Sequence, residues 1–233
     1  MTVSETPRGT VLFPGAGSFG GEFRPLIREL EPLAWLAKYP GRFGRDFGTP
    51  AESFDQVVRL CTEQVSTRQL ECPVLLGHSF GACVAYATAA MLEEAGRAIS
   101  ALVVVGATAP TRIAVPASAT STPSGTAAYL DNVDPTALTD LPSEEWREVV
   151  AETAMHDLRL LGQFPALQCK PVRCPVLAVR GDSDPLTSDA GIGEWEHATH
   201  GACSQHVFSG GHSDFLRSPD FASWFLEARG ELG

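Results

Sequence analysis

The chain has 233 residues, of which 44% are hydrophobic and 19% are charged, so a disordered or fibrous protein is excluded and one large domain with room for an insertion is expected. The 28 acidic and 17 basic residues give a net charge of -11, which argues against a protein that binds nucleic acid through its phosphates. The longest apolar runs, such as 101–107, are too short for a membrane span. The polar first ten residues do not look like a secretory signal, so we expect no membrane association and a cytoplasmic location.

Short apolar runs alternate with amphipathic stretches, which is typical of an α/β domain with a mostly parallel sheet. Strands are expected at residues 10–13, 33–39, 73–76, 101–106, 175–180 and 204–208. Apolar residues between 54 and 65 recur at helical spacing, so a helix is predicted to begin after Ser53 and to pack on the sheet. Near the end, Ser218 followed by Pro219 predicts the N-cap and first turn of a closing helix.

Residues 110–164 interrupt this alternation, because they contain no strand-like run. A Ser/Thr/Pro/Ala-rich stretch leads into helix-compatible sequence at 143–163. An interruption of this length indicates a functional insertion, here a lid, in a core formed by residues 1–109 and 165–233. For 114–126 a disordered linker is the alternative.

The strongest local motif is the G-x-S-x-G of Gly77, Ser79 and Gly81, which stands between an expected strand and a helix-compatible run. This is the context of a nucleophile elbow, in which a strained turn presents the serine hydroxyl at the carboxyl edge of the sheet. The two glycines leave room for strand and helix to cross closely. Ser79 is therefore the candidate nucleophile.

A serine hydroxyl needs a base and an orienting acid, and both follow later in the chain. His212 lies on a glycine-rich loop after the last expected strand, where an imidazole can reach Ser79. Asp184 lies on the loop after the preceding strand and is the favoured acid, with Asp182 as the fallback. The chain order Ser, Asp, His is that of α/β-hydrolases.

An oxyanion hole needs two backbone N–H groups, and the residue after the nucleophile, Phe80, supplies one. The glycine-rich loop after the first strand is the source of the second, for which we favour the amide of Ala16. No metal-binding or redox motif is present, since the six cysteines form no C-x-x-C pair or Cys/His ligand spacing.

The same loop also permits a different function. Gly15, Gly17 and Gly20 form a G-x-G-x-x-G after a strand, which is a pattern of NAD(P)-binding oxidoreductases. Pro14 before the first glycine and the lack of an acidic residue at the end of the second strand count against this alternative. Arg42, as a partner for a 2′-phosphate, keeps it open.

A set of motifs in chain order resembles one family, the stand-alone type II thioesterases of polyketide and nonribosomal peptide synthases, within the α/β-hydrolases. These motifs are LFPGAG at 12–17, YPGR at 39–42, GHSFGA at 77–82, GATAP at 106–110, GDSDP at 181–185 and GGH at 210–212. The resemblance implies a helical lid at 110–164, and the family's nucleophile, acid and base fall on Ser79, Asp184 and His212.

The activity that this resemblance implies is hydrolysis of acyl groups from the phosphopantetheine arm of an acyl or peptidyl carrier protein, which removes aberrant or stalled chains. The enzyme is expected to act as a monomer and to need no cofactor or metal of its own, because the partner carries the phosphopantetheine. A serine esterase or acyltransferase on the same fold is the alternative.

Overall fold

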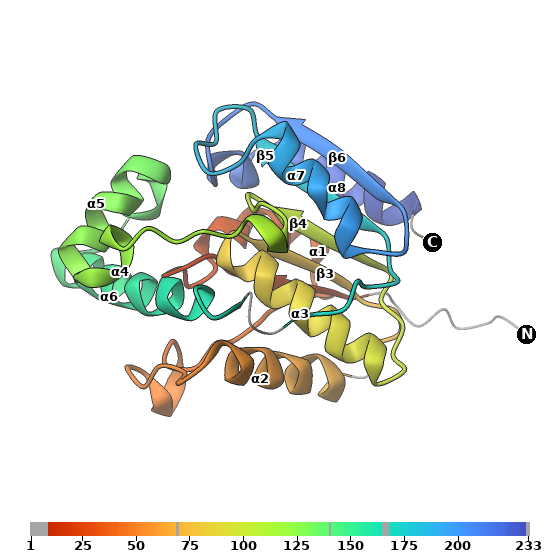
Figure 1. Ribbon diagram of the computed structural model, residues 1–233, viewed down its shortest axis with the longest axis horizontal. Helices are drawn as coiled ribbons and strands as arrows, with labels where there is room; N and C mark the ends of the chain where they lie inside the picture. The colour runs from red at the N-terminus through yellow and green to blue at the C-terminus, as the bar shows by residue number, and fades with distance from the viewer. Residues whose placement is uncertain (1–8, 69, 140, 165–167, 232–233) are drawn as a thin grey trace, which may run out of the picture.

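The computed structural model describes residues 9–68, 70–139, 141–164 and 168–231. Residues 1–8, which make up most of the stretch considered as a secretory signal, lie outside the described residues. Residue 165, where the second part of the core is expected to begin, also lies outside them. In Figure 1 a central sheet lies between helices on both faces, and a separate group of helices stands beyond one end of the strands. None of the described helices is long and apolar enough to cross a bilayer.

Six strands form one sheet, and all of its neighbouring pairs are parallel. The strand order is β2-β1-β3-β4-β5-β6. The strands are β1 (Thr10–Phe13), β2 (Ala34–Leu36), β3 (Val74–His78), β4 (Ala101–Val105), β5 (Val176–Gly181) and β6 (Cys203–Phe208). Each expected strand is therefore present.

The second strand is shorter than predicted because the chain turns away from the sheet after it. Ala37 still donates a hydrogen bond to the Leu12 carbonyl at 2.8 Å. The Lys38 N–H and carbonyl then bond to the Gln64 side chain at 2.9 Å and 2.8 Å, and Gly41 takes a positive φ of 80°, so the chain leaves the ladder. Tyr39 is buried beside the sheet instead of within it.

Successive residues of the strands point to opposite faces, and each face has its own core. Val11 and Phe13 pack with helices α2 (Phe54–Thr67) and α3 (Phe80–Glu94), whereas Leu12 packs with α1 (Arg24–Leu30) and α8 (Pro219–Glu231). Both predicted caps form, because the Ser53 hydroxyl accepts from the Gln56 N–H and the Ser218 hydroxyl accepts from the Phe221 N–H, each at 3.1 Å.

Between β4 and β5 the chain forms helices instead of strands, as predicted. They are α4 (Ser118–Ser121), α5 (Pro123–Val133) and α6 (Glu144–Leu161), which gather at the left of Figure 1. The other short elements are α7 (Asp189–Gly193) and the 3-10 turns η1 (Gly21–Phe23), η2 (Gly44–Asp46), η3 (Pro110–Arg112), η4 (Pro135–Ala137), η6 (Glu194–Ala198) and η7 (Asp214–Arg217).

The alternative of a disordered linker at 114–126 is wrong. Thr122 caps α5 by accepting a hydrogen bond from the Gly125 N–H at 3.1 Å. The buried Thr126 hydroxyl donates to the Ala119 carbonyl at 2.8 Å and so ties α5 to α4. The threonines that made the segment look like a linker thus form its local hydrogen bonds.

Candidate active site

Ser79 stands at the sharp turn between β3 and α3. Its φ of 53° and ψ of -118° are strained for a residue with a side chain. A Cβ on Gly77 would lie 2.2 Å from the Gly81 carbonyl oxygen, and one on Gly81 would lie 2.1 Å from the Phe13 carbonyl oxygen. The crossing of strand and helix therefore requires both glycines, as the motif predicted.

His212 and Asp184 are brought together from two loops at the carboxyl edge of the sheet. The imidazole Nδ1 lies 3.0 Å from Asp184 Oδ2, and both residues are buried. Asp184 also accepts hydrogen bonds from the Leu186 N–H at 2.9 Å and from the Thr187 hydroxyl at 2.8 Å. Burial alone would raise the pKa of Asp184, but the contact with His212 and these hydrogen bonds lower it below its usual value.

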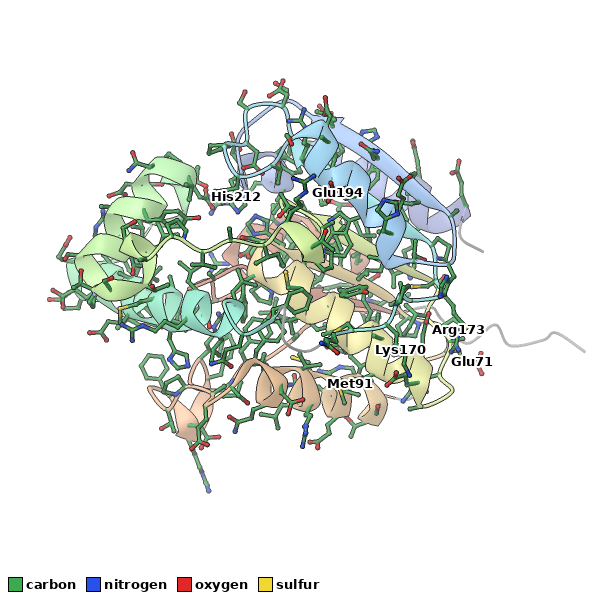
Figure 2. The ribbon with its side chains drawn as sticks, in the orientation of Figure 1. Glu71, Met91, Lys170, Arg173, Glu194 and His212 are labelled. Atoms are coloured by element: carbon green, nitrogen blue, oxygen red, sulfur yellow. The ribbon has the colours of Figure 1, made fainter. Side chains whose placement is uncertain are left out.

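An ionised Asp184 fixes the state of the imidazole that faces it. Because a carboxylate only accepts hydrogen bonds, Nδ1 of His212 carries the proton, which leaves Nε2 as the basic atom in the neutral ring. His212 and Ser79 line the same cavity, and Figure 2 shows His212 at the edge of the sheet that faces the α4–α6 helices. Ser79 and the His212–Asp184 pair therefore face one shared cavity.

The fallback acid, Asp182, does not contact His212. Its carboxylate is exposed and accepts hydrogen bonds from the Gly210 N–H at 3.0 Å and from the Ser183 hydroxyl at 2.9 Å. The bond from Gly210 ties the loop after β5 to the loop that carries His212. Of the two acids weighed from the sequence, the structure brings only Asp184 to the imidazole.

A buried ion pair, Glu22 with His78, lies directly behind the site, and the sequence patterns did not indicate it. His78 Nε2 donates to the His212 carbonyl at 3.2 Å, while its Nδ1 lies 3.8 Å from Glu22 Oε1, an ion-pair distance. Glu22 also accepts from the Gly15 N–H at 3.1 Å and from the Ser18 hydroxyl. The pair thus connects the glycine-rich loop, the nucleophile strand and the His212 loop.

Both members of this pair have shifted pKa values. Burial alone would raise the pKa of Glu22, but His78 and the Ser18 hydroxyl lower it to about 2. Burial would lower the pKa of His78, yet Glu22 raises it above its usual value. The stability from Glu22 is present above its ordinary value of 4.5 and is lost as the pH falls towards 2. The stability from His78 is present below 6.5 and is lost as the pH rises through its higher folded value.

We therefore expect the pair to stabilise the fold most between about pH 4.5 and 6.5. Glu22→Gln is expected to lower the free energy of unfolding by about 3 kcal/mol in that range and by less on either side. Urea unfolding from pH 3 to 8 measures this difference. The control is Glu29→Gln, which removes an exposed carboxylate from the neighbouring helix. A Glu22→Gln curve parallel to that of the parent at every pH would contradict the assignment.

The glycine-rich loop is also held from the other side, by helix α6. Asp157 accepts the Gly17 N–H at 2.8 Å and forms an ion pair with Arg42, which donates in turn to the Ser18 carbonyl. A Cβ on Gly17 would lie 2.7 Å from the Ala154 Cβ, so the loop and α6 are in close contact. Among the described residues, no hydrogen bond occupies the N–H of Ala16 or Phe80, the two expected oxyanion donors. Ala16 lines the cavity beside Ser79.

We expect Asp157→Asn to loosen this loop. Arg42 would keep its charge in a buried position without its carboxylate partner, which costs about 3 kcal/mol of unfolding free energy. Because the loop would no longer be fixed, kcat is expected to fall about tenfold while KM changes little. Urea unfolding and steady-state kinetics measure the two effects. Glu152→Gln, an exposed position on the same helix, is the matched control, and equal kinetics in both variants would refute the positioning role.

A cavity of about 950 Å³ opens above Ser79 and His212. Part of its rim is aromatic, since the Phe19 ring packs edge-on against Phe43 and Trp146, and Trp146 contacts Phe47. Apolar residues of the α5 and α6 segments, among them Leu130 and Val150, line its interior. The helices between β4 and β5 therefore form one wall of the cavity.

The features that suggested a dinucleotide site have other uses in the structure. Arg42 has an exposed fraction of only 2% and is occupied by Asp157. The Gly15–Gly20 loop is bonded to Glu22 and Asp157, and it lines the cavity that contains Ser79 and His212. No cluster of His, Cys, Asp and Glu among the described residues is arranged to hold a metal ion.

The parallel sheet, the strained serine after β3 and the Asp184–His212 pair define an α/β-hydrolase. The family model of the thioesterase domain matches residues 10–226, and the chain belongs to this family. The type II thioesterase BorB, from the borrelidin biosynthetic cluster, superposes with a TM-score of 0.85 at 26% identity over 98% of this chain and 93% of that one.

Two curated relatives are similar to this chain over most of its length. A protein of Streptomyces griseus described as "Probable cadicidin biosynthesis thioesterase" is 27% identical over 87% of this chain. Phenyloxazoline synthase MbtB of Mycobacterium tuberculosis is 26% identical over 91% of this chain. The chain spans 56% of the length of the first protein and 15% of the second.

Proposed function

We propose that this protein is a serine thioesterase that releases acyl groups from the phosphopantetheine arm of a carrier protein, as a stand-alone enzyme of polyketide or nonribosomal peptide biosynthesis. The observation that carries the proposal is the strained Ser79 in one cavity with His212, whose Nδ1 lies 3.0 Å from Asp184. The likeness to BorB and to the cadicidin relative supports the thioester substrate.

The chemistry assigned to these residues is acyl transfer in two steps. His212 Nε2 takes the proton of Ser79 Oγ as Oγ attacks the thioester carbonyl carbon. The N–H groups of Phe80 and Ala16 stabilise the resulting oxyanion. The C–S bond then breaks, His212 gives its proton to the departing sulfur, and an acyl-serine is left. Water, deprotonated by His212, attacks this ester, and the acid leaves as Ser79 regains its proton.

The biological role that follows is removal of aberrant or stalled acyl chains. A cavity of about 950 Å³ with an aromatic rim accepts an acyl chain without requiring specific polar contacts to it. We assign the α4–α6 helices as the lid over this cavity. Such a site suits an enzyme that clears several different acyl groups.

The test is to incubate the protein with an acyl-loaded carrier protein and to follow the free thiol. An oxygen ester of the same acyl group and an added alcohol acceptor run in parallel. We expect hydrolysis of the acyl-carrier protein, with release of free thiol and acid, at a higher kcat/KM than hydrolysis of the oxygen ester. We also expect a fluorophosphonate to label Ser79. Hydrolysis of the ester without release from the carrier would contradict the proposal in favour of an esterase. Transfer to the alcohol instead of water would favour an acyltransferase.

A further inference from the structure

Three exposed arginines from two distant segments line the mouth of the active-site cavity. Arg24 and Arg28 lie four positions apart on α1, so they share one face of that helix. Arg217 belongs to η7, which packs against α1. The fold therefore places three guanidinium groups at the mouth of the cavity that contains Ser79 and His212.

Three other charged groups of this lining are buried and bonded within the protein. Glu22 pairs with His78, and Arg42 pairs with Asp157. Asp134 accepts hydrogen bonds from the hydroxyls of Thr136 and Ser213 at 2.8 Å and 2.7 Å. In the described part of the chain, the solvent-facing charge of the lining is thus wholly positive, although the protein as a whole carries a net charge of -11.

This local charge matters because overall charge would repel an acidic partner. Arg24 and Arg28 form no ion pair with any carboxylate in the described residues, so their charge is not neutralised within the protein. Guanidinium groups bind phosphate and carboxylate oxygens through two parallel N–H bonds. The mouth therefore has the chemistry of an anion site that can bind a phosphate.

We infer that Arg24, Arg28 and Arg217 bind the phosphodiester that joins the pantetheine arm to its carrier protein. This inference rests on the proposed function, because that function places the thioester carbonyl at Ser79 and leaves the other end of the arm outside. The phosphodiester is the group of the arm that carries charge. The arginines then hold the arm at its charged end while the catalytic residues act at the thioester.

The sharpest test compares two small substrates, an acyl-pantetheine and the same acyl-4′-phosphopantetheine, which differ only in the phosphate. We expect the parent protein to prefer the phosphorylated substrate about tenfold in kcat/KM, with the difference in KM. In the double variant Arg24→Gln/Arg28→Gln and in Arg217→Gln the ratio of the two kcat/KM values is expected to fall towards one.

Raising the salt concentration is expected to reduce this ratio in the parent protein, because exposed charges are screened. Arg45→Gln, an exposed arginine outside the cavity lining, is the matched control and is expected to keep the parent preference.

The outcomes separate this inference from the proposed function. If the parent protein hydrolyses both substrates equally well, the phosphate site is refuted and the thioesterase assignment stands. If it hydrolyses neither these substrates nor an acyl-carrier protein, the proposed function itself fails. If the arginine variants are impaired only on the acyl-carrier protein, the arginines contact the carrier's protein surface, which overturns the phosphodiester assignment.

Discussion

Ser79→Ala is expected to lower kcat for release of an acyl group from a carrier protein by about 10⁴-fold or more. The variant has no Oγ to form the acyl-serine, so neither His212 nor the oxyanion donors can act through it. Any residual rate comes from binding and from water attacking the thioester directly. Free thiol released over time measures the loss.

The fold is expected to survive this change, which makes the result interpretable. The Ser79 hydroxyl forms no hydrogen bond with any other described residue, so its removal leaves no buried partner unsatisfied. Circular dichroism and the thermal midpoint should therefore match those of the parent protein. Ser204→Ala, at an exposed position on β6, is the control and should keep full activity. Activity in Ser79→Ala within tenfold of the parent would exclude Ser79 as the nucleophile.

Gly81→Ala is expected to have the largest effect on stability, with a loss of at least about 5 kcal/mol of unfolding free energy or failure to fold. The added Cβ would lie 2.1 Å from the Phe13 carbonyl oxygen and 2.5 Å from the Pro14 carbonyl oxygen. Both clashes are with backbone, so no side chain can rotate to relieve them. Helix α3 would have to move away from β1 and carry Ser79 with it.

The matched control makes the same substitution where there is space. A Cβ on Gly230, in the last turn of α8, would meet no atom within 4 Å, and alanine favours a helix over glycine by up to about 1 kcal/mol. Gly230→Ala is therefore expected to be neutral or slightly stabilising. Urea unfolding and soluble yield compare the two variants. Equal stability of Gly81→Ala and Gly230→Ala would contradict the close crossing at the elbow.

The sequence predicted the features of this protein that depend on local patterns. Except for β6, whose centre is polar, the strands are short and largely apolar, and Ser53 and Ser218 are cap residues whose effect lies within three residues. The G-x-S-x-G was informative because the glycines it requires are adjacent to the serine in the chain. Asp184 was separable from Asp182 by its position on the loop, and the contact with His212 agrees with that choice.

Other features were beyond these patterns because they depend on contacts between distant segments. Asp157 on α6 reaches Arg42 and the Gly17 N–H, 115 and 140 positions away along the chain. Glu22 looks like an ordinary surface carboxylate on a short turn, yet it is buried against His78. Residues 114–126 have a composition common to linkers and to capped short helices, and only packing against α6 distinguishes the two.

The attachment of α6 to the core has a consequence for exchanging the proposed lid between relatives. Besides Asp157, this end of the segment is attached through His156, whose Nε2 lies 2.6 Å from the Ala51 carbonyl, and through Gln163, which accepts the Phe54 N–H at 3.1 Å. A graft that replaces the whole of 110–164 would remove the Asp157 contacts that hold the glycine-rich loop, together with one wall of the cavity. A segment exchanged to test the proposed lid should therefore end before His156, so that the chimera keeps the host's Asp157 contacts to Arg42 and Gly17.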